Sequence, residues 1–364
     1  MVFRRGGKLG KKEKWSYKGD EIEIVSEFKC FGFTFAVTGS MEKHITYVVG
    51  KAKKAINASW GLMKRIGLEK LSKRMYLLET LARSGCLYGV EIWGLKRREP
   101  IEKMQGKFMK MIMGLNNNTP DYIWKLEAGV KSLVLYTRNR AVDYVARILN
   151  MEDERWPKIC LKEEIRGLGN GEPTIWGSEL KKTWEEAGKG EMQLLLKNGI
   201  NGSVFGEKMK EGLIILNEQD TQQDFIGVEK SRYWEWYKTY KENYHREPYW
   251  EEENIKGRWR EQWARIRCGN MSKEGRKGFS NEICRICKIE SESFNHIWVC
   301  SKAREKMRIN VVRELEEWKV KSGGADENWG EIIREALKGK PIREICIYAI
   351  ELEKIIREGK NETK

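Results

Sequence analysis

Three cysteines and one histidine near the carboxyl end have the spacing of a metal site. Cys284 and Cys287 form a Cys-x2-Cys pair, and after eight residues His296 and Cys300 form a His-x3-Cys pair. A close pair, a returning loop and a second pair are what a tetrahedral zinc ion needs. We expect residues 295–299 to begin a helix, which places the second pair on one face because its members are four positions apart. Four protein ligands leave no open position for water, so the zinc would be structural.

Two alternatives to a metal site stay open for these four residues. They could be unrelated core residues, or two of the cysteines could form a disulfide beside an uninvolved histidine. Metal binding is favoured, because thiols in an intracellular chain bind metal more often than they pair. Cys268, upstream of the cluster, is a reserve ligand.

The elements that must position these residues are mainly helical, so we predict a mainly α protein with a small amino-terminal β element, in the α+β class. Residues 14–38 alternate polar and apolar side chains and are rich in aromatics, which indicates two short strands or a small meander. From Met41 to residue 150, apolar residues recur every three or four positions, as in a bundle of amphipathic helices. The chain after Cys300 has the same helical periodicity.

Five segments follow from these patterns. They are a β segment at 1–38, a basic helical bundle at 39–150, a linker region at 151–230, an aromatic-rich segment with the cysteine-histidine cluster at 231–310, and carboxy-terminal helices at 311–364. Glycine and asparagine loop signals around short helices indicate the linker.

The net charge of +15 is concentrated in the first part of the chain. Residues 1–150 hold 29 lysines and arginines against 14 acidic residues, whereas the remaining residues hold 40 of each. A basic half joined to a neutral half indicates a surface that meets a polyanion, and a phosphate backbone is the commonest such partner. The alternative is a solvated charged surface without a partner.

The residues expected to contact phosphates lie in three places. They are Arg4 and Arg5 near the amino end, Lys51, Lys53, Lys54, Lys64 and Arg65 on the first long helix, and Arg258, Arg260 and Arg267 downstream. The last three stand in or just after a segment dense in tryptophan and tyrosine, and aromatics interleaved with cations can stack bases while contacting phosphates. The alternative is that these aromatics pack a small domain that lacks long aliphatic side chains.

The sequence has no secretory signal and no apolar run of membrane-spanning length. We therefore expect a soluble intracellular protein, nuclear or cytoplasmic, with neither a membrane partner nor a small-molecule substrate. A hydrolase is disfavoured, because none of the three histidines has a convincing nucleophile or carboxylate partner in sequence.

Seven features stand in an order that is hard to obtain by chance. They are Val2–Gly7, Glu27–Gly32, the basic helix from Met41, Cys86–Gly94, Thr119–Ile123, Arg265–Asn270 and the cysteine-histidine cluster. In this order they resemble the carboxy-terminal part of a non-long-terminal-repeat retrotransposon reverse transcriptase of the jockey-like insect kind. The resemblance implies that residues 1–38 end a polymerase palm and that residues 39–150 are a helical thumb gripping a template-primer duplex. The cluster would be a zinc knuckle that helps to hold template RNA or target DNA.

The sequence also departs from this family. Polymerase chemistry needs adjacent aspartates that hold two magnesium ions. The family carries these aspartates upstream of where this chain begins, and no two aspartates are adjacent here. We therefore expect a fragment that is inactive alone, with magnesium needed only by the full-length enzyme and an upstream polymerase domain as a partner. The His-x3-Cys spacing is one residue shorter than the commonest family form. The alternative function is a zinc-stabilised helical protein-interaction module, which binds a partner through residues 311–356 and has no affinity for nucleic acid.

Overall fold

The computed structural model describes residues 14–188, 190, 199, 201–231, 233–272, 283–324 and 327–361. These divide into two compact units. The first unit contains the chain up to Ser59, Leu78–Gln105 and Ser132–Asp220, and the second contains Trp60–Leu77, Gly106–Lys131 and the chain from Thr221 onward. The predicted mainly α fold with a small amino-terminal β element is confirmed. Among the described helices, none combines the length and the apolar character needed to span a bilayer.

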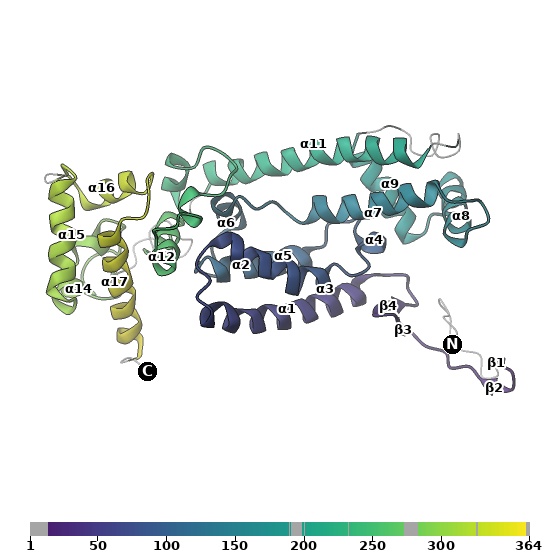
Figure 1. The fold of residues 1–364 in the computed structure, drawn as a ribbon, viewed down its shortest axis with the longest axis horizontal. Helices are drawn as coiled ribbons and strands as arrows, with labels where there is room; N and C mark the ends of the chain where they lie inside the picture. Colours follow the sequence, from purple (N-terminus) through teal and green to yellow (C-terminus); the bar gives the residue numbers. More distant parts are fainter. Residues whose placement is uncertain are drawn as a thin grey trace. The chain divides into compact units, whose positions relative to one another are not determined.

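The first unit opens with two small hairpins and continues as helices (Figure 1). Its strands are β1 (Ser16–Tyr17), β2 (Asp20–Glu21), β3 (Glu27–Cys30) and β4 (Phe33–Ala36). Its helices are most of α1 (Glu42–Arg65), η1 (Leu78–Arg83), α3 (Ser84–Cys86), α4 (Val90–Trp93), the first half of α5 (Glu99–Ile112), α7 (Val134–Leu149), α8 (Trp156–Asn170), α9 (Ile175–Glu186) and most of α11 (Gly202–Glu229). Strands β3 and β4 pair antiparallel. Their two-residue turn, Phe31 and Gly32, has φ values of 48° and 82°, as a tight hairpin turn requires.

The amphipathic pattern of α1 becomes a buried stripe and an exposed surface. Ile45, Val48 and Ile56 are at most 3% exposed. The helix ends at Arg65. Gly67 follows its last turn with φ of 61°, and the Leu68 N–H donates back to the Met63 carbonyl oxygen at 3.1 Å, as at a glycine-terminated helix end.

Residues 151–230 have more structure than a linker. Helices α8, α9 and α11 share one hydrophobic core with α7, in which Val145, Trp184 and Phe205 are fully buried. The rings of Trp184 and Phe205 stack with centroids 5.3 Å apart. Gly167 and Gly169 have the character of loop residues in the sequence but lie inside α8, which ends at Asn170 and is capped by Gly171. The burial of apolar side chains from neighbouring helices outweighs the modest helix propensity of glycine here.

The second unit holds the remaining helices. They are α2 (Leu71–Leu77), α6 (Asp121–Ala128), η2 (Glu235–Thr239), η3 (Pro248–Trp250), α12 (Gly257–Arg267), α13 (His296–Val299), α14 (Ser301–Lys306), α15 (Ile309–Lys321), α16 (Trp329–Ala336) and α17 (Arg343–Asn361), together with the ends of α1, α5 and α11. Helices α15 and α17 lie side by side in the carboxy-terminal part (Figure 1). The helical tail predicted after Cys300 is therefore confirmed.

Candidate metal centre

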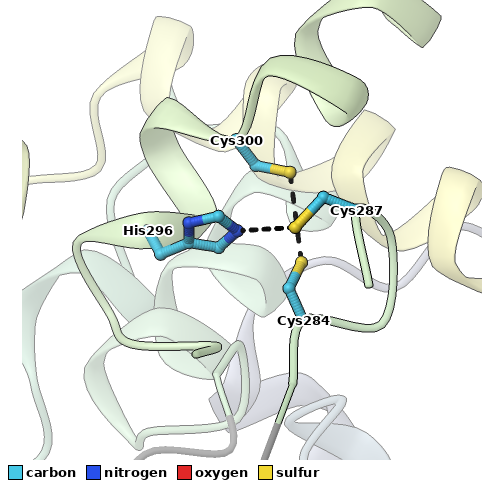
Figure 2. Close-up of side chains that lie close together, drawn as sticks. All are labelled: Cys284, Cys287, His296 and Cys300. Carbon is cyan, nitrogen blue, oxygen red and sulfur yellow. Dashed lines mark hydrogen bonds between the residues drawn. The ribbon is translucent and has the colours of Figure 1, made fainter. Parts of the chain in front are cut away.

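The four predicted ligands come together in the second unit, with their side-chain tips pointing toward one another (Figure 2). Cys284 and Cys287 lie on one loop. His296 begins α13, and Cys300 follows its last residue. The Cys300 N–H donates to the His296 carbonyl oxygen at 2.9 Å. The predicted helical turn thus aligns the second pair, because residues four apart share a helix face.

The distances between the ligand atoms fit a tetrahedral ion. All four atoms lie within 4.8 Å of one another. The Sγ atoms of Cys284 and Cys300 are 4.0 Å apart, and the Cys287 Sγ lies 3.5 Å from the His296 Nε2. Bonds of about 2.3 Å to sulfur and about 2.0–2.1 Å to nitrogen give tetrahedral edges of about 3.8 Å between sulfurs and about 3.6 Å between sulfur and nitrogen. The cluster therefore has the dimensions of a metal site.

Backbone amides around the Cys-x2-Cys pair donate to its sulfurs. The Ile286 N–H donates to the Cys284 Sγ at 3.4 Å, and the Cys287 N–H donates to the same sulfur. The N–H groups of Ile289 and Glu290 donate to the Cys287 sulfur. Donors directed at sulfur favour the thiolate, which is the form that binds metal.

The ligand loop is closed by its own backbone. Ile283 and Ser291 form an antiparallel bridge, and the Cys284 N–H donates to the Glu290 carbonyl oxygen at 2.7 Å. Lys288 turns the chain between them with φ of 60°, a conformation uncommon for a residue other than glycine. The loop is also tied to a residue outside it, because the Arg285 side chain donates to the Met271 carbonyl oxygen at 3.0 Å.

The three thiols differ in their affinity for a proton. Burial raises the pKa of Cys284 and of Cys300, in the latter to about 12. Burial acts on Cys287 in the same direction, but the amides of Glu290 and Ile289 outweigh it, and the pKa of Cys287 falls to about 7. A divalent cation would favour all three thiolates, because it compensates their negative charge.

His296 is oriented by groups on both sides of its ring. Its Nε2 faces Cys287, and its Nδ1 lies 3.0 Å from a carboxylate oxygen of Glu290. Its backbone N–H donates to the Ser293 hydroxyl at 3.0 Å. A carboxylate that accepts the Nδ1 proton leaves Nε2 free for a metal, an arrangement typical of histidine ligands. This role of Glu290 was not predicted from the sequence. Its position as an acidic residue inside the ligand loop was the signal that could have indicated it.

The cluster is largely closed to solvent. Cys284 and Cys300 are each 2% exposed and His296 is 5% exposed. Next to His296 in α13, the Trp298 ring stacks on Tyr348 of α17 with centroids 5.3 Å apart, and the Tyr348 hydroxyl donates to the Trp298 carbonyl oxygen at 3.1 Å. A metal held by four protein ligands here would join the loop to this helix packing and would have no position for a reacting water.

Cys268, the reserve ligand, lies elsewhere. It is fully buried, and burial raises its pKa well above the ordinary value for a thiol. Within the described parts of the chain, the metal-site cluster contains Cys284, Cys287, His296 and Cys300 without it.

The lysines predicted to contact phosphates on α1 are accessible. Lys51, Lys53, Lys54, Lys64 and Arg65 are all exposed. Lys64 lies 4.7 Å from the centroid of the Trp60 ring and 3.9 Å from a carboxylate oxygen of Glu261. Arg4 and Arg5 lie outside the described residues.

The downstream arginines divide into one exposed and two buried side chains. Arg258 is exposed. Arg260 and Arg267 each have side chains that are 1% exposed. Arg260 donates to the carbonyl oxygens of Tyr249 and Glu252. Arg260 is therefore withdrawn from the predicted phosphate contacts, because its guanidinium group faces protein and not solvent.

Arg267 belongs to a buried ionic network. Its guanidinium lies 2.8 Å from Glu127 and 3.0 Å from Glu247. Glu127 is fully buried and accepts hydrogen bonds from the hydroxyls of Tyr249 at 2.6 Å and Tyr237 at 2.9 Å. Buried charges need such partners. The predicted phosphate contact at Arg267 is corrected for this reason.

Five aromatic side chains of the aromatic-rich segment are buried. Trp234, Tyr237, Tyr249, Trp250 and Trp263 are at most 3% exposed. Their burial favours a packing role over the stacking of bases for these five side chains.

Comparison of the chain with protein-family models, with curated proteins and with solved structures finds no match. The resemblance to a reverse transcriptase therefore stays a prediction from the sequence.

Proposed function

We propose that the cysteine-histidine cluster binds zinc and that the ion is structural. Three thiolates and one imidazole nitrogen form a typical structural zinc ligand set, and soft thiolates favour zinc over magnesium or calcium. The amides directed at the two loop sulfurs and the carboxylate behind His296 support this choice. The ion would fix the loop at 283–291 against α13.

We further propose that the protein binds nucleic acid through the basic surface of α1. The observation that carries this proposal is the exposure of Lys51, Lys53 and Lys54 on a helix whose apolar stripe is buried. Lysines on a rigid helix can contact successive phosphates without reading base sequence. The concentration of positive charge in residues 1–150 supports the same surface.

An aromatic side chain lies beside these lysines. The Lys29 and Lys51 ammonium groups are 3.9 and 5.6 Å from the centroid of the Tyr47 ring. The Lys29 hydrogen bond to the Tyr47 hydroxyl lowers the pKa of Tyr47. Phe28, Lys29, Lys43 and Tyr47 line a hollow of about 620 Å³, together with Glu27 and Glu42. An aromatic ring with cations around it suits an unpaired base and its phosphate.

The order of the sequence segments leads us to propose a more specific identity. The chain would be the nucleic-acid-binding carboxy-terminal part of a retrotransposon RNA-directed DNA polymerase. DNA synthesis would then require an upstream polymerase domain, whose adjacent aspartates hold magnesium. The basic helix followed by a closed cluster of three cysteines and one histidine supports this proposal.

The test is salt-dependent binding of a primer-template duplex. Counterion release makes log K fall linearly with log salt, by about 0.9 per phosphate contact. Replacing Lys53 and Lys54 by alanine should weaken binding and reduce the slope by about two. Replacing Lys181 and Lys182, an adjacent exposed pair on α9, is the matched control. A flat salt response, or an equal effect of both variants, would favour the protein-interaction alternative.

A further inference from the structure

A groove beside α15 and α17 brings together three arginines that are far apart in sequence. Arg258 comes from α12, Arg308 precedes α15, and Arg343 begins α17. All three line one hollow of about 340 Å³ in the second unit. Glu314 and Glu351 line the same hollow, so its charged side chains are three arginines and two carboxylates, an excess of one positive charge.

The arginines keep donors available to a ligand. Arg308 pairs with Glu351, yet 74% of its side chain is exposed. Arg343 pairs with Glu314 at 2.9 Å and with Glu344 at 3.4 Å, both through Nη1, and is 50% exposed. A guanidinium group has five N–H donors, so contacts through one nitrogen leave donors on the other two. Arg258 is exposed and has no acidic partner within the described ranges.

Three apolar side chains also line the groove. Val311 is buried, and Ile347 and Ile350 are half-buried along α17. These three side chains line the same hollow as the arginines. Its volume is at the small end of ligand sites, which span roughly 300–1,000 Å³. It has room for one flat group with an attached anion and not for a peptide helix.

We propose that this groove binds one nucleotide of a single-stranded RNA or DNA segment. The phosphate would meet the guanidinium groups of Arg258, Arg308 and Arg343, since their planar forks match phosphate oxygens. The base would lie against Val311, Ile347 and Ile350, which requires that it be unstacked and unpaired. This inference rests on the proposed nucleic-acid binding, but it concerns a surface separate from α1 and a different form of the ligand.

Fluorescence anisotropy of the full chain with a labelled ten-residue oligothymidylate tests the groove. Arg258→Ala and Arg343→Ala should each weaken binding about tenfold, the usual effect of losing one hydrogen bond to a charged group. Each should also reduce the salt slope by about one. Arg313→Ala is the matched control, because Arg313 is 66% exposed on α15 and does not line the groove. Unchanged melting temperatures would show that the exposed substitutions leave the fold intact.

A blunt duplex in the same assay separates the groove from the α1 surface. Loss of oligothymidylate binding in Arg258→Ala with duplex binding unchanged supports the groove, and it does so even if the α1 lysines prove irrelevant. Equal affinity of Arg258→Ala, Arg313→Ala and the unmodified protein for the oligonucleotide overturns it. Displacement of the oligonucleotide by polyglutamate at equal charge would assign the groove to acidic peptides. Displacement by AMP at the same nucleotide concentration would assign it to free nucleotides. Either result overturns the proposal.

Discussion

Replacement of Arg267 by methionine should destabilise the second unit and leave intrinsic nucleic-acid affinity unchanged. Methionine retains an unbranched side chain but removes the cation between Glu127 and Glu247. Glu127 would then be a fully buried carboxylate whose remaining close partners are the Tyr237 and Tyr249 hydroxyls. The sequence predicts a phosphate contact at Arg267, so this variant separates the two roles.

The expected loss follows from the burial of the pair. Removing one partner of a buried ion pair costs about 3–5 kcal/mol, because the other charge stays buried without compensation. Lys241 still pairs with Glu247 at 2.5 Å, so the carboxylate left without a cation is mainly that of Glu127. We expect the free energy of unfolding to fall by about 4 kcal/mol. At about 2–4 °C per kcal/mol for a unit of this size, the melting temperature should fall by roughly 8–16 °C.

Urea and thermal unfolding followed by circular dichroism would measure this loss. The matched control is Arg258→Met on the same helix, where an exposed side chain should change stability by less than about 0.5 kcal/mol. Adding Glu127→Leu to Arg267→Met should recover part of the loss, and the double-mutant cycle gives the coupling energy. The reasoning would be refuted if Arg267→Met unfolded like the unmodified protein while its folded form bound a duplex less tightly.

Three further predictions concern the metal, acid and catalysis. Elemental analysis should find one zinc per chain. Cys300→Ser or a chelator should lower the melting temperature, because structural zinc binding contributes to folding. An unchanged melting temperature of the metal-free protein would contradict this prediction. Burial would raise the pKa of Glu127, but Arg267 more than offsets it and holds that pKa below the ordinary range. The resulting stability should be fully present above the unfolded-state pKa of about 4.3 and be lost as pH falls through the lower folded-state pKa. Glu127→Gln should lack this part of the acid dependence, and an identical pH profile would argue against it. A primer-extension assay with magnesium should yield no DNA, whereas synthesis of labelled product would show that the chain has its own polymerase centre.

Local spacing predicted that Cys284, Cys287, His296 and Cys300 come together, as they do in the structure. In a Cys-x2-Cys loop, nearby backbone amides donate hydrogen bonds to the two sulfurs. A histidine and a cysteine four positions apart lie on the same face of one helical turn. Both pairs therefore depend on geometry within a few residues. Glu290, which orients His296, lies inside the same loop and was within reach of the same reasoning.

The linker prediction and two phosphate contacts failed for a different reason. Glycines inside α8 resembled loop signals, yet the helix buries Leu161 and Leu168 against neighbouring helices. Arg260 and Arg267 stand in or just after an aromatic-rich stretch, and its possible packing into a small domain does not indicate which of its cations are buried. A side chain's exposure depends on what covers it, and the covering residues are distant in sequence.

The sequence by itself determined the helical character of the chain, the segregation of its charge and the four residues of the candidate metal centre. These features depend on amino-acid composition, on the helical periodicity of apolar residues and on the short spacings between the cysteines and the histidine. Only the tertiary structure decided that Arg267 pairs with Glu127, 140 residues away, and that arginines from α12, from the residue before α15 and from α17 share one groove. The physical reason is that desolvation of a charge and convergence of charges are set by contacts between elements, and no local pattern along the chain records those contacts.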